Sequence, residues 1–379
     1  MRGVESRPSE AKRAREWRRQ VRRWIALLVV STVAASAAPS EAAVQVVLRT
    51  PRPIAAAAAA GDRIAWMQVG ACRRGYSVFR INLRTHHQAR LTSCFAPRGD
   101  LTNFALAGVR TMWSQSFEYR HVTVASVLSA SRLGDMHVVA TFRARGCGGD
   151  GCNQGLSGLK VLDGLASGGN RLFYGVADVA AGTTCSGGVC DEMYTGGRVR
   201  RLTPMGPVTV PGAPGPSILA ARGRRLADVP LIPGSTDLRP SHTVDILNAL
   251  TGMPIATITV PDEILEIALS QSVLGVLTLT AGGAYEIRRY TSTGTLLGTT
   301  ALTPTRNYGA LFATGTKLVF KTKHEIFMMN ALTGVYRPIH VDGHTVGLLG
   351  VTRGLVLWSG LWSPAAERTI FGMPLPPNP

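Results

Sequence analysis

One short motif recurs along the chain and limits the folds available to it. Its consensus is a small residue, usually Gly, then two positions, an apolar residue, one position and an aromatic residue, and some copies depart from it at one or two positions. The clear copies are Gly61–Trp66, Gly108–Trp113, Gly169–Tyr174, Gly315–Phe320 and Arg353–Trp358, and the weaker ones are Gly223–Asp228 and Gln271–Val276. Successive copies start 38 to 61 residues apart. Seven copies at such spacings predict repeated supersecondary units.

A second repeat marks a turn. Asn248–Gly252 reads Asn-Ala-Leu-Thr-Gly and recurs letter for letter at Asn330–Gly334, with Thr293-Gly294 between the two copies and a partial copy at Asn82–Thr85. Each follows the alternating pattern of a half-buried strand, and Gly permits the positive φ that a tight turn needs. Units of ~40–50 residues made only of strands and turns predict an all-β, seven-bladed β-propeller with four antiparallel strands per blade.

The first unit predicts the layout of a blade. Its strands, from the centre outward, are Pro53–Ala60, Arg63–Val69, Tyr76–Leu83 and Gln88–Thr92. The run of Ala in the first strand is small enough for a crowded centre. The aromatic residue on the second strand is expected to pack between blades, as core rather than as part of a ligand site.

The last unit is one strand short. After Gly343 the sequence predicts only Thr345–Val351, Leu355–Ser359 and Arg368–Pro374. The segment Val44–Thr50 is strand-like and has no partner near it in the sequence. We expect it to pair beside Arg368–Pro374 and close the ring, which removes exposed sheet edges.

The motifs carry a resemblance to known repeats. Gly61–Trp66, followed by an alternating strand and by Arg90-Leu91-Thr92, resembles the repeats of TolB-type propellers, and Arg200–Thr203 closes the third unit with the same ending. The Thr-Gly turns are similar to those of pyrroloquinoline-quinone and surface-layer propeller repeats. The resemblance covers residues 54–377, lacks the full Ser-Pro-Asp-Gly signature, and implies the fold and an interaction role in the cell envelope. It implies no catalytic residue.

The first forty residues predict a targeting segment. Residues 1–23 hold nine Lys or Arg and three Glu, and the apolar run Trp24–Ala38 follows directly, with small residues near its end. This is the layout of a secretory signal, and the run is shorter than the ~20 residues that span a bilayer. We therefore expect a signal segment at 1–40, a single propeller domain at 41–379, and an exported or envelope-associated protein. An uncleaved membrane anchor is the alternative.

The net charge of +18 is carried mainly by Arg, which outnumbers Lys 36 to 5. We interpret this ratio as the codon usage of a GC-rich genome rather than as a polyanion site. Nucleic acid is accordingly not expected as a partner, no membrane span is expected after the signal segment, and the chain is expected to be a monomer.

The six cysteines are even in number, which fits an oxidising compartment. Two pairs share one spacing and enclose Gly-rich loops. Chain order predicts the disulfides Cys72–Cys94, Cys147–Cys152 and Cys185–Cys190. Cross-pairing between the last two pairs, and a zinc site made by the same four residues, are the alternatives.

All six cysteines map to one face of the predicted propeller. In a four-stranded meander, the loop after the second strand and the loop after the fourth strand lie on the same face. Long stapled loops suit a binding surface because rigid loops lose less entropy on binding. Arg73, Arg74 and Asp150 lie in these loops and are candidate ligand contacts. Stapling that only resists unfolding and proteolysis explains the loops equally well.

The segment His340–His344 joins the last two units on the same face. Alternate residues of an extended segment point the same way, so His340, Asp342 and His344 are candidate ligands for a metal such as zinc. The alternative is an Asp-Gly turn flanked by two solvent-facing histidines. No other cofactor is indicated.

Motifs of the common enzyme classes are absent from the sequence. It contains no Gly-x-Ser-x-Gly elbow, phosphate loop or dinucleotide fingerprint. Asp262, Glu263 and Glu266 are interpreted as charges that protect a strand edge. The sequence therefore predicts an exported, non-enzymatic propeller that binds a protein or cell-wall polymer through its loop-rich face. A hydrolase or lyase with a His/Asp site on that face, and a membrane-anchored envelope sensor, are the alternatives.

Overall fold

In the computed structural model, Ala42–Pro379 form one compact unit. The described residues are 43–379 without 73–74, 97–99, 120–121, 146–157, 187–188, 235–239, 304–305, 342–345, 353 and 361–364. They form twenty-eight β-strands and one short 3-10 helix, Ala366–Arg368. Among them, none belongs to a helix with the length and apolarity that crossing a bilayer requires.

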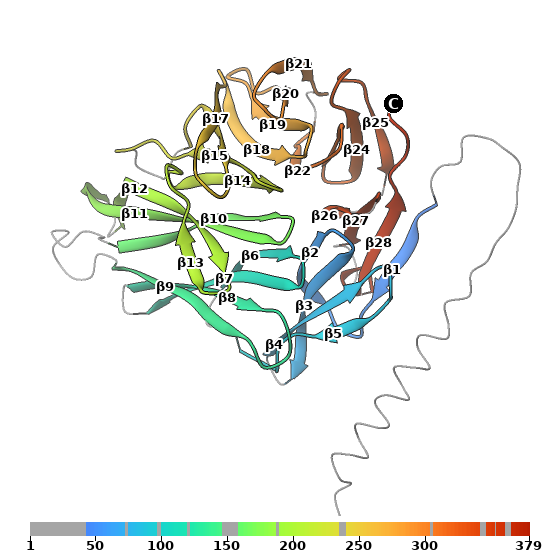
Figure 1. Ribbon diagram of the computed structural model, residues 1–379, viewed down its shortest axis with the longest axis horizontal. Helices are drawn as coiled ribbons and strands as arrows, with labels where there is room; N and C mark the ends of the chain where they lie inside the picture. Colours follow the sequence, from blue (N-terminus) through green and yellow to red (C-terminus); the bar gives the residue numbers. More distant parts are fainter. Residues whose placement is uncertain are drawn as a thin grey trace, which may run out of the picture. The chain divides into compact units, whose positions relative to one another are not determined.

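The strands form seven blades of four antiparallel strands around a common centre (Figure 1). Blades two and three are joined in one eight-stranded sheet, because β9 pairs with β10 where Ala144 lies opposite Gly158. The inner strands are β2 (Ile54–Ala60), β6 (Asp100–Ala107), β10 (Gly158–Gly168), β14 (Pro216–Arg222), β18 (Glu263–Leu269), β22 (Gly309–Thr314) and β26 (Val346–Thr352). The second strands are β3 (Arg63–Cys72), β7 (Arg110–Tyr119), β11 (Arg171–Ser186), β15 (Arg225–Pro230), β19 (Val273–Leu279), β23 (Lys317–Lys321) and β27 (Leu355–Gly360).

The third strands are β4 (Gly75–Asn82), β8 (Val122–Ala130), β12 (Val189–Thr203), β16 (Thr243–Asn248), β20 (Tyr285–Thr291), β24 (Glu325–Asn330) and β28 (Thr369–Pro374). The outer strands are β5 (Gln88–Arg90), β9 (His137–Arg145), β13 (Gly206–Thr209), β17 (Pro254–Thr259), β21 (Leu296–Ala301), β25 (Tyr336–Val341) and β1 (Gln45–Arg49). Each inner strand contacts the inner strands of both neighbouring blades, so the seven blades form a ring. The predicted seven-bladed propeller is confirmed.

The first strand of the chain belongs to the last blade. β1 pairs antiparallel with β28, with Gln45 opposite Gly372 and Arg49 opposite Thr369. Val47 and Leu48 pack against a cluster that contains Trp66 of the first blade. That this pairing is what holds the ring closed stays a prediction.

Both sequence repeats are turns with a local cause. The Gly of the aromatic motif lies between the first and second strands, with φ of +62° at Gly61 and +55° at Gly315, a region that favours Gly. In the Asn-Ala-Leu-Thr-Gly turn, the Asn330 side-chain oxygen accepts a hydrogen bond from the Leu332 N–H at 3.0 Å. The turn is tied to its own blade, because the Ala331 N–H donates to the Thr316 carbonyl at 2.8 Å. Local chemistry therefore sets these turns.

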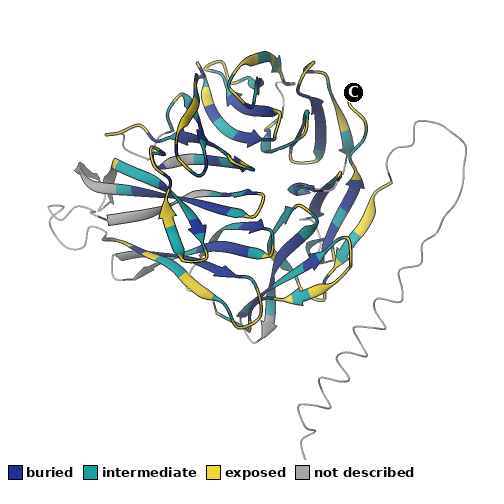
Figure 2. Cartoon of the chain, in the orientation of Figure 1, coloured by how far each residue is buried: buried dark blue, intermediate teal, exposed yellow. Residues whose placement is uncertain are grey.

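The aromatic residue of the motif packs on the preceding blade. Trp66 shares a buried cluster with Leu357 and Ile370 of the last blade, and Trp113 shares one with Met67 and Val78 of the first. Burying one such side chain stabilises the folded state by about 3 kcal/mol. Burial is accordingly greatest in the middle strands of each blade, while turns and outer strands are exposed (Figure 2). The predicted core role of these aromatics is confirmed.

The connections define two faces. The turns between first and second strands and between third and outer strands lie on one side, which we call the turn face. The connections between second and third strands, and from each outer strand to the next blade, lie on the opposite side, which we call the rim face. The loops that hold the predicted site residues belong to the rim face.

Candidate functional site

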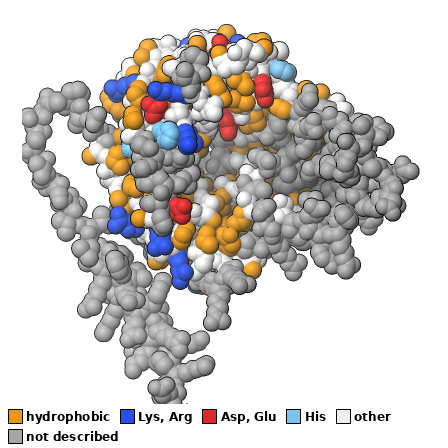
Figure 3. All heavy atoms as spheres, turned by 180° about the vertical axis from the view of Figure 1, so that it is seen from behind, with side chains coloured by type: hydrophobic (Ala, Val, Ile, Leu, Met, Phe, Trp, Pro, Cys, Tyr) orange, Lys and Arg blue, Asp and Glu red, His pale blue; other side chains and the backbone are white. Residues whose placement is uncertain are grey.

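Most of the predicted site residues lie outside the residues that the structure describes. These are Arg73, Arg74, Cys147, Asp150, Cys152, Asp342 and His344. The ligand contacts and the metal site that they would form stay predictions. Figure 3 shows one face of the molecule, on which acidic, basic and apolar side chains are mixed.

His340 is described, and its ring is in contact with a core residue. It lies near the end of β25, opposite Ile326 of β24. The imidazole and the Trp358 indole have ring centroids 4.6 Å apart. His340 therefore packs between blades six and seven. Within the described part of the chain, no three His, Cys, Asp or Glu residues are grouped so that they could hold a metal ion.

Two cysteines near the first blade are placed by backbone pairing. Cys94 is disulfide-bonded. Its neighbour Phe95 exchanges backbone hydrogen bonds of 2.7 and 3.0 Å with Tyr76, at the start of β4. Cys72, at the end of β3, lies opposite Gly75. The two cysteines thus belong to adjoining parts of one blade, although the partner of Cys94 stays a prediction.

The third blade carries the next cysteine pair. Cys185 and Cys190 lie directly opposite each other in the register of β11 and β12. Directly opposed residues of antiparallel strands have Cα atoms about 4.5 or 5.5 Å apart, within the range that a disulfide spans. The backbone is therefore compatible with the predicted local pair.

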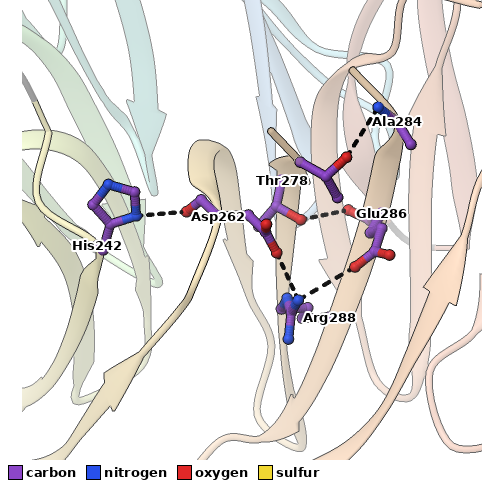
Figure 4. A network of polar contacts seen from close by, with 7 residues as sticks. His242, Asp262, Thr278, Ala284, Glu286 and Arg288 are labelled. Atoms are coloured by element: carbon purple, nitrogen blue, oxygen red, sulfur yellow. Dashed lines mark hydrogen bonds and ion pairs between the residues drawn. The ribbon is translucent and has the colours of Figure 1, made fainter. Parts of the chain in front are cut away.

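A polar network that the sequence did not indicate occupies the rim face of blades four and five (Figure 4). The Arg288 guanidinium donates to the Asp262 carboxylate at 2.6 Å and lies 3.3 Å from the Glu286 carboxylate. His242 Nδ1 is 3.0 Å from the Asp262 backbone carbonyl. Asp262 lies in the connection from β17 to β18, and His242 directly precedes β16. The network therefore joins two blades at the base of the rim loops.

Glu266, interpreted from the sequence as a charge that protects a strand edge, is partly buried in the structure. It lies on the inner strand β18, after a β-bulge, opposite Leu277, which packs in a cluster with Leu318 of the next blade. Burial raises the pKa of the Glu266 carboxyl to about 7. Glu266 therefore lies on the edge strand of its sheet, as interpreted, but it is partly buried, and this burial disfavours its charge.

Asp228 occupies the aromatic position of the motif in the fourth blade. It is fully buried, and neither carboxyl oxygen has a hydrogen-bond partner in the described part of the structure. It lies opposite Asp245 on β16. Burial, and then the charge of Asp245, hold the pKa of Asp228 well above its ordinary value. A buried carboxyl of this kind keeps its proton where an exposed aspartate is ionised.

Tyr194 of the third blade lies near this carboxyl. Its hydroxyl donates to the Gly215 carbonyl at 3.5 Å. Burial raises the pKa of the Tyr194 phenol, and the charges of Asp178 and Asp228 add to the shift. Blades three and four approach so closely here that a Cβ on Gly197 would lie 2.7 Å from the Gly215 Cα. The only sequence signal for this cluster is an Asp at an aromatic position of the repeat.

No known protein-family model matches this sequence, nor does any curated protein sequence. Solved structures of similar fold include an uncharacterized protein from Listeria monocytogenes EGD-e, at 7% identity, covering 89% of this chain and 98% of that chain with a TM-score of 0.47. The β-propeller domain of the Trilobed protease from Pyrococcus furiosus is 10% identical, covering 85% and 95%, with a TM-score of 0.43. BamB from Moraxella catarrhalis is 11% identical, covering 87% and 97%, with a TM-score of 0.39.

Proposed function

We propose that this chain is an exported, non-enzymatic β-propeller that binds a protein or a cell-envelope polymer through its rim face. The observation that carries the proposal is the β11–β12 hairpin. β11 has 16 residues and β12 has 15, and the inner strand β10 ends its pairing with β11 where Gly158 lies opposite Val179. Beyond Val179, where the described pairing with β10 ends, β11 and β12 continue to pair with each other on the rim side as far as Ser186 opposite Val189.

A long two-stranded hairpin on the rim side is a suitable binding element. Its backbone hydrogen bonds are made within the hairpin, so little conformational entropy is lost when a partner docks. The Cys185–Cys190 pair that we propose would fix its tip, and the proposed Cys72–Cys94 and Cys147–Cys152 pairs would staple neighbouring rim loops. The turns on the opposite face are short and are bonded to their own blades, as scaffold turns are.

The compartment is part of the same proposal. The basic stretch and the apolar run before residue 39 support export, with the propeller following as one domain. An oxidising compartment would also keep the proposed disulfides intact.

Shortening the hairpin tests the function. We replace residues 181–192 by Asn-Gly, which leaves Ala180 and Met193, already opposite each other, as the pair flanking a two-residue turn. The immobilised unit 42–379 is exposed to a detergent-solubilised envelope extract and to purified cell-wall polymer, and bound material is cross-linked and identified. Leu332→Ser, on the turn face, is the control variant.

We expect one partner to be retained by the wild type and by Leu332→Ser, and to be lost by the hairpin variant. Retention of that partner by the hairpin variant, with near-UV circular dichroism showing a folded blade ring, would place binding elsewhere. The solubilised extract contains no bilayer, so this result is independent of any contact that the turn face makes with lipid.

A further inference from the structure

Five consecutive blades expose a large apolar side chain on the turn face. Each lies in or directly beside the turn between the third and outer strands, and each is more than half exposed, Met205 at 97%. They are Leu133, Met205, Met253, Leu296 and Leu332, from blades two to six in order. One exposed apolar residue needs no explanation, but the same position in five successive turns forms an arc of apolar tips.

Backbone hydrogen bonds hold two of the turns that carry this arc. In blade four the Ala249 N–H donates to the Arg224 carbonyl at 2.8 Å, and in blade six the Ala331 N–H makes the equivalent bond to Thr316. The outer turns of these two blades are thereby tied to the inner turns of the same blades. These bonds fix the backbone of the turns that carry the exposed side chains of Met253 and Leu332.

The turn face that carries the apolar tips also carries an excess of basic residues. Among the described residues of the turn-face connections and the strand residue on each side of them, nine are basic and two are acidic. The basic residues are Arg63, Arg84, Arg110, Arg132, Arg171, Arg222, Arg224, Arg225 and Lys317, and the acidic ones are Asp62 and Asp135.

Both aspartates are engaged within the turn face. Asp62 lies 3.0 Å from the Arg63 guanidinium. The Asp135 carboxylate accepts hydrogen bonds from the backbone N–H groups of Ser131 and Arg132 at 2.8 and 3.1 Å. Neither carboxylate therefore needs a partner outside the chain, and the face keeps its positive excess.

Six of these nine basic residues fall into two groups. Arg171 and Arg225 donate to carbonyls of the next blade, Gly223 and Gln271, at 3.1 and 3.0 Å, and so join blades. A second group is exposed, and its side chains have no acidic partner among the described residues. This group is Arg84, Arg132, Arg222 and Arg224. The exposed group is available for an external anion.

The combination of apolar tips and exposed arginines identifies the occupant. A soluble polyanion would use the arginines and leave the apolar tips in water. A bilayer with anionic headgroups satisfies both, because the apolar tips enter the boundary between headgroups and acyl chains while the arginines meet the phosphates.

The path of the chain agrees with this orientation. β1 starts at the turn face, because Gln45 lies opposite Gly372, near the end of β28 that reaches this face. The apolar run of the sequence ends at Ala38, seven residues before Gln45. The polypeptide therefore enters the propeller on the same face as the apolar tips.

We propose that the turn face docks on an anionic lipid bilayer. This contact uses the face opposite the hairpin, so the rim face remains directed away from the lipid and free for its own partner. It requires no membrane-spanning segment, because the apolar tips and the arginines together supply the attraction.

Vesicle sedimentation tests the proposal. The unit 42–379 contains all the strands and hydrophobic clusters of the described structure, so it carries its own core. We expect it to sediment with vesicles that contain phosphatidylglycerol and not with vesicles of phosphatidylcholine alone. Added salt should weaken the binding, because it screens the arginines.

Two sets of substitutions separate the two contributions. The apolar-tip variant has Leu133, Met205, Met253, Leu296 and Leu332 changed to Ser. The arginine variant has Arg84, Arg132, Arg222 and Arg224 changed to Gln. Each should lose at least about tenfold in vesicle affinity, since each charge near an anionic surface contributes about a factor of five.

The matched controls lie at the rim end of the blades. Val341→Ser removes an apolar residue that is 65% exposed, and Arg49→Gln with Arg143→Gln removes two exposed charges. These controls should bind vesicles as the wild type does. Near-UV circular dichroism confirms that every variant is folded.

Three results would overturn the proposal. The first is no sedimentation with anionic vesicles. The second is wild-type vesicle binding by the apolar-tip variant together with loss by the arginine variant and tight binding to heparin, which would identify a soluble polyanion as the occupant. The third is equal loss by the rim controls, which would show attraction without a defined face.

Discussion

Asp228 lies opposite Asp245 on neighbouring strands, at the place where other blades bury an aromatic ring. The other six motifs place Trp, Tyr, Phe or Val at this position and pack it on the preceding blade. The fourth blade instead buries a carboxyl without a hydrogen-bond partner among the described residues. Such a group destabilises the fold when it is ionised, and this gives the protein a pH dependence.

The direction of the pKa shift determines whether the folded protein becomes more or less stable as the pH rises. The pKa of Asp228 is raised in the folded protein, so the folded state holds a proton that the unfolded state releases. Its contribution to stability is complete below the ordinary pKa of about 4 and is lost as the pH rises through the raised pKa. Asp228→Asn should therefore be more stable than the wild type at neutral pH, and in urea titrations from pH 4 upward its unfolding free energy should depend less on pH.

Asp245→Asn is the companion variant for that experiment. It removes the charge that adds to the Asp228 shift and leaves the buried carboxyl in place. The pH dependence of its unfolding free energy should be intermediate between that of the wild type and that of Asp228→Asn. Identical profiles for all three proteins would show that Asp228 does not titrate in this way.

Glu266 also lowers the stability of the folded protein as the pH rises. Burial raises the pKa of its carboxyl from 4.5 to about 7, so stability is lost as the pH rises from 4.5 through 7. The loss above the folded pKa is about 3 kcal/mol. Glu266→Gln should remove this loss, and carboxyl titration by NMR of the labelled protein should show one Glu that titrates near neutral pH. A Glu266 resonance that titrates near 4.5 would contradict the assignment.

Deleting residues 44–50 should lower the unfolding free energy by more than the removal of a surface strand would. The deletion removes β1, exposes the edge of β28, and takes Val47 and Leu48 away from the cluster around Trp66. We expect the unfolding free energy to fall by at least about 3 kcal/mol. Hydrogen exchange should quicken in β28 and in the first blade, and a protein that starts at residue 42 is the control. Exchange that quickens only in β28 would show that the strand does not hold the ring together.

Non-reducing peptide mapping should find Cys72–Cys94, Cys147–Cys152 and Cys185–Cys190. Backbone pairing favours the last pair, since the two residues are opposite each other on β11 and β12. Cys94 is already disulfide-bonded, and its expected partner is Cys72. Peptides that join Cys147 or Cys152 to Cys185 or Cys190 would reject local pairing.

The two faces should respond differently to substitution. Replacing His340, Asp342 and His344 together with Ala should weaken rim-face ligand or metal binding and leave the domain folded. Asn330→Ala removes the acceptor for the Leu332 N–H and should cost about 1 kcal/mol of stability without affecting that binding. Asn330→Asp, which keeps an acceptor, is its control. Binding lost through Asn330→Ala, with the triple variant unaffected, would reverse the assignment of faces.

The sequence alone determined the blade count and the turns. The aromatic motif at Gly61, Gly108 and Gly169 and the Asn-Ala-Leu-Thr-Gly turns depend on local chemistry: positive φ at Gly and a side-chain acceptor at Asn. Local rules act within a few residues, so a single sequence displays them. The predicted pairing of Val44–Thr50 with Arg368–Pro374 also followed, because one blade lacked a strand.

Only the tertiary structure decided the environment of the charged groups. Asp228 and Glu266 look like ordinary surface acids in the sequence, and their burial depends on neighbouring blades whose residues lie tens of positions away. The arc from Leu133 to Leu332 likewise becomes one surface only when five turns are brought to one side of the ring. Burial and shared faces depend on contacts between blades, and the spacing of residues within one blade does not contain that information.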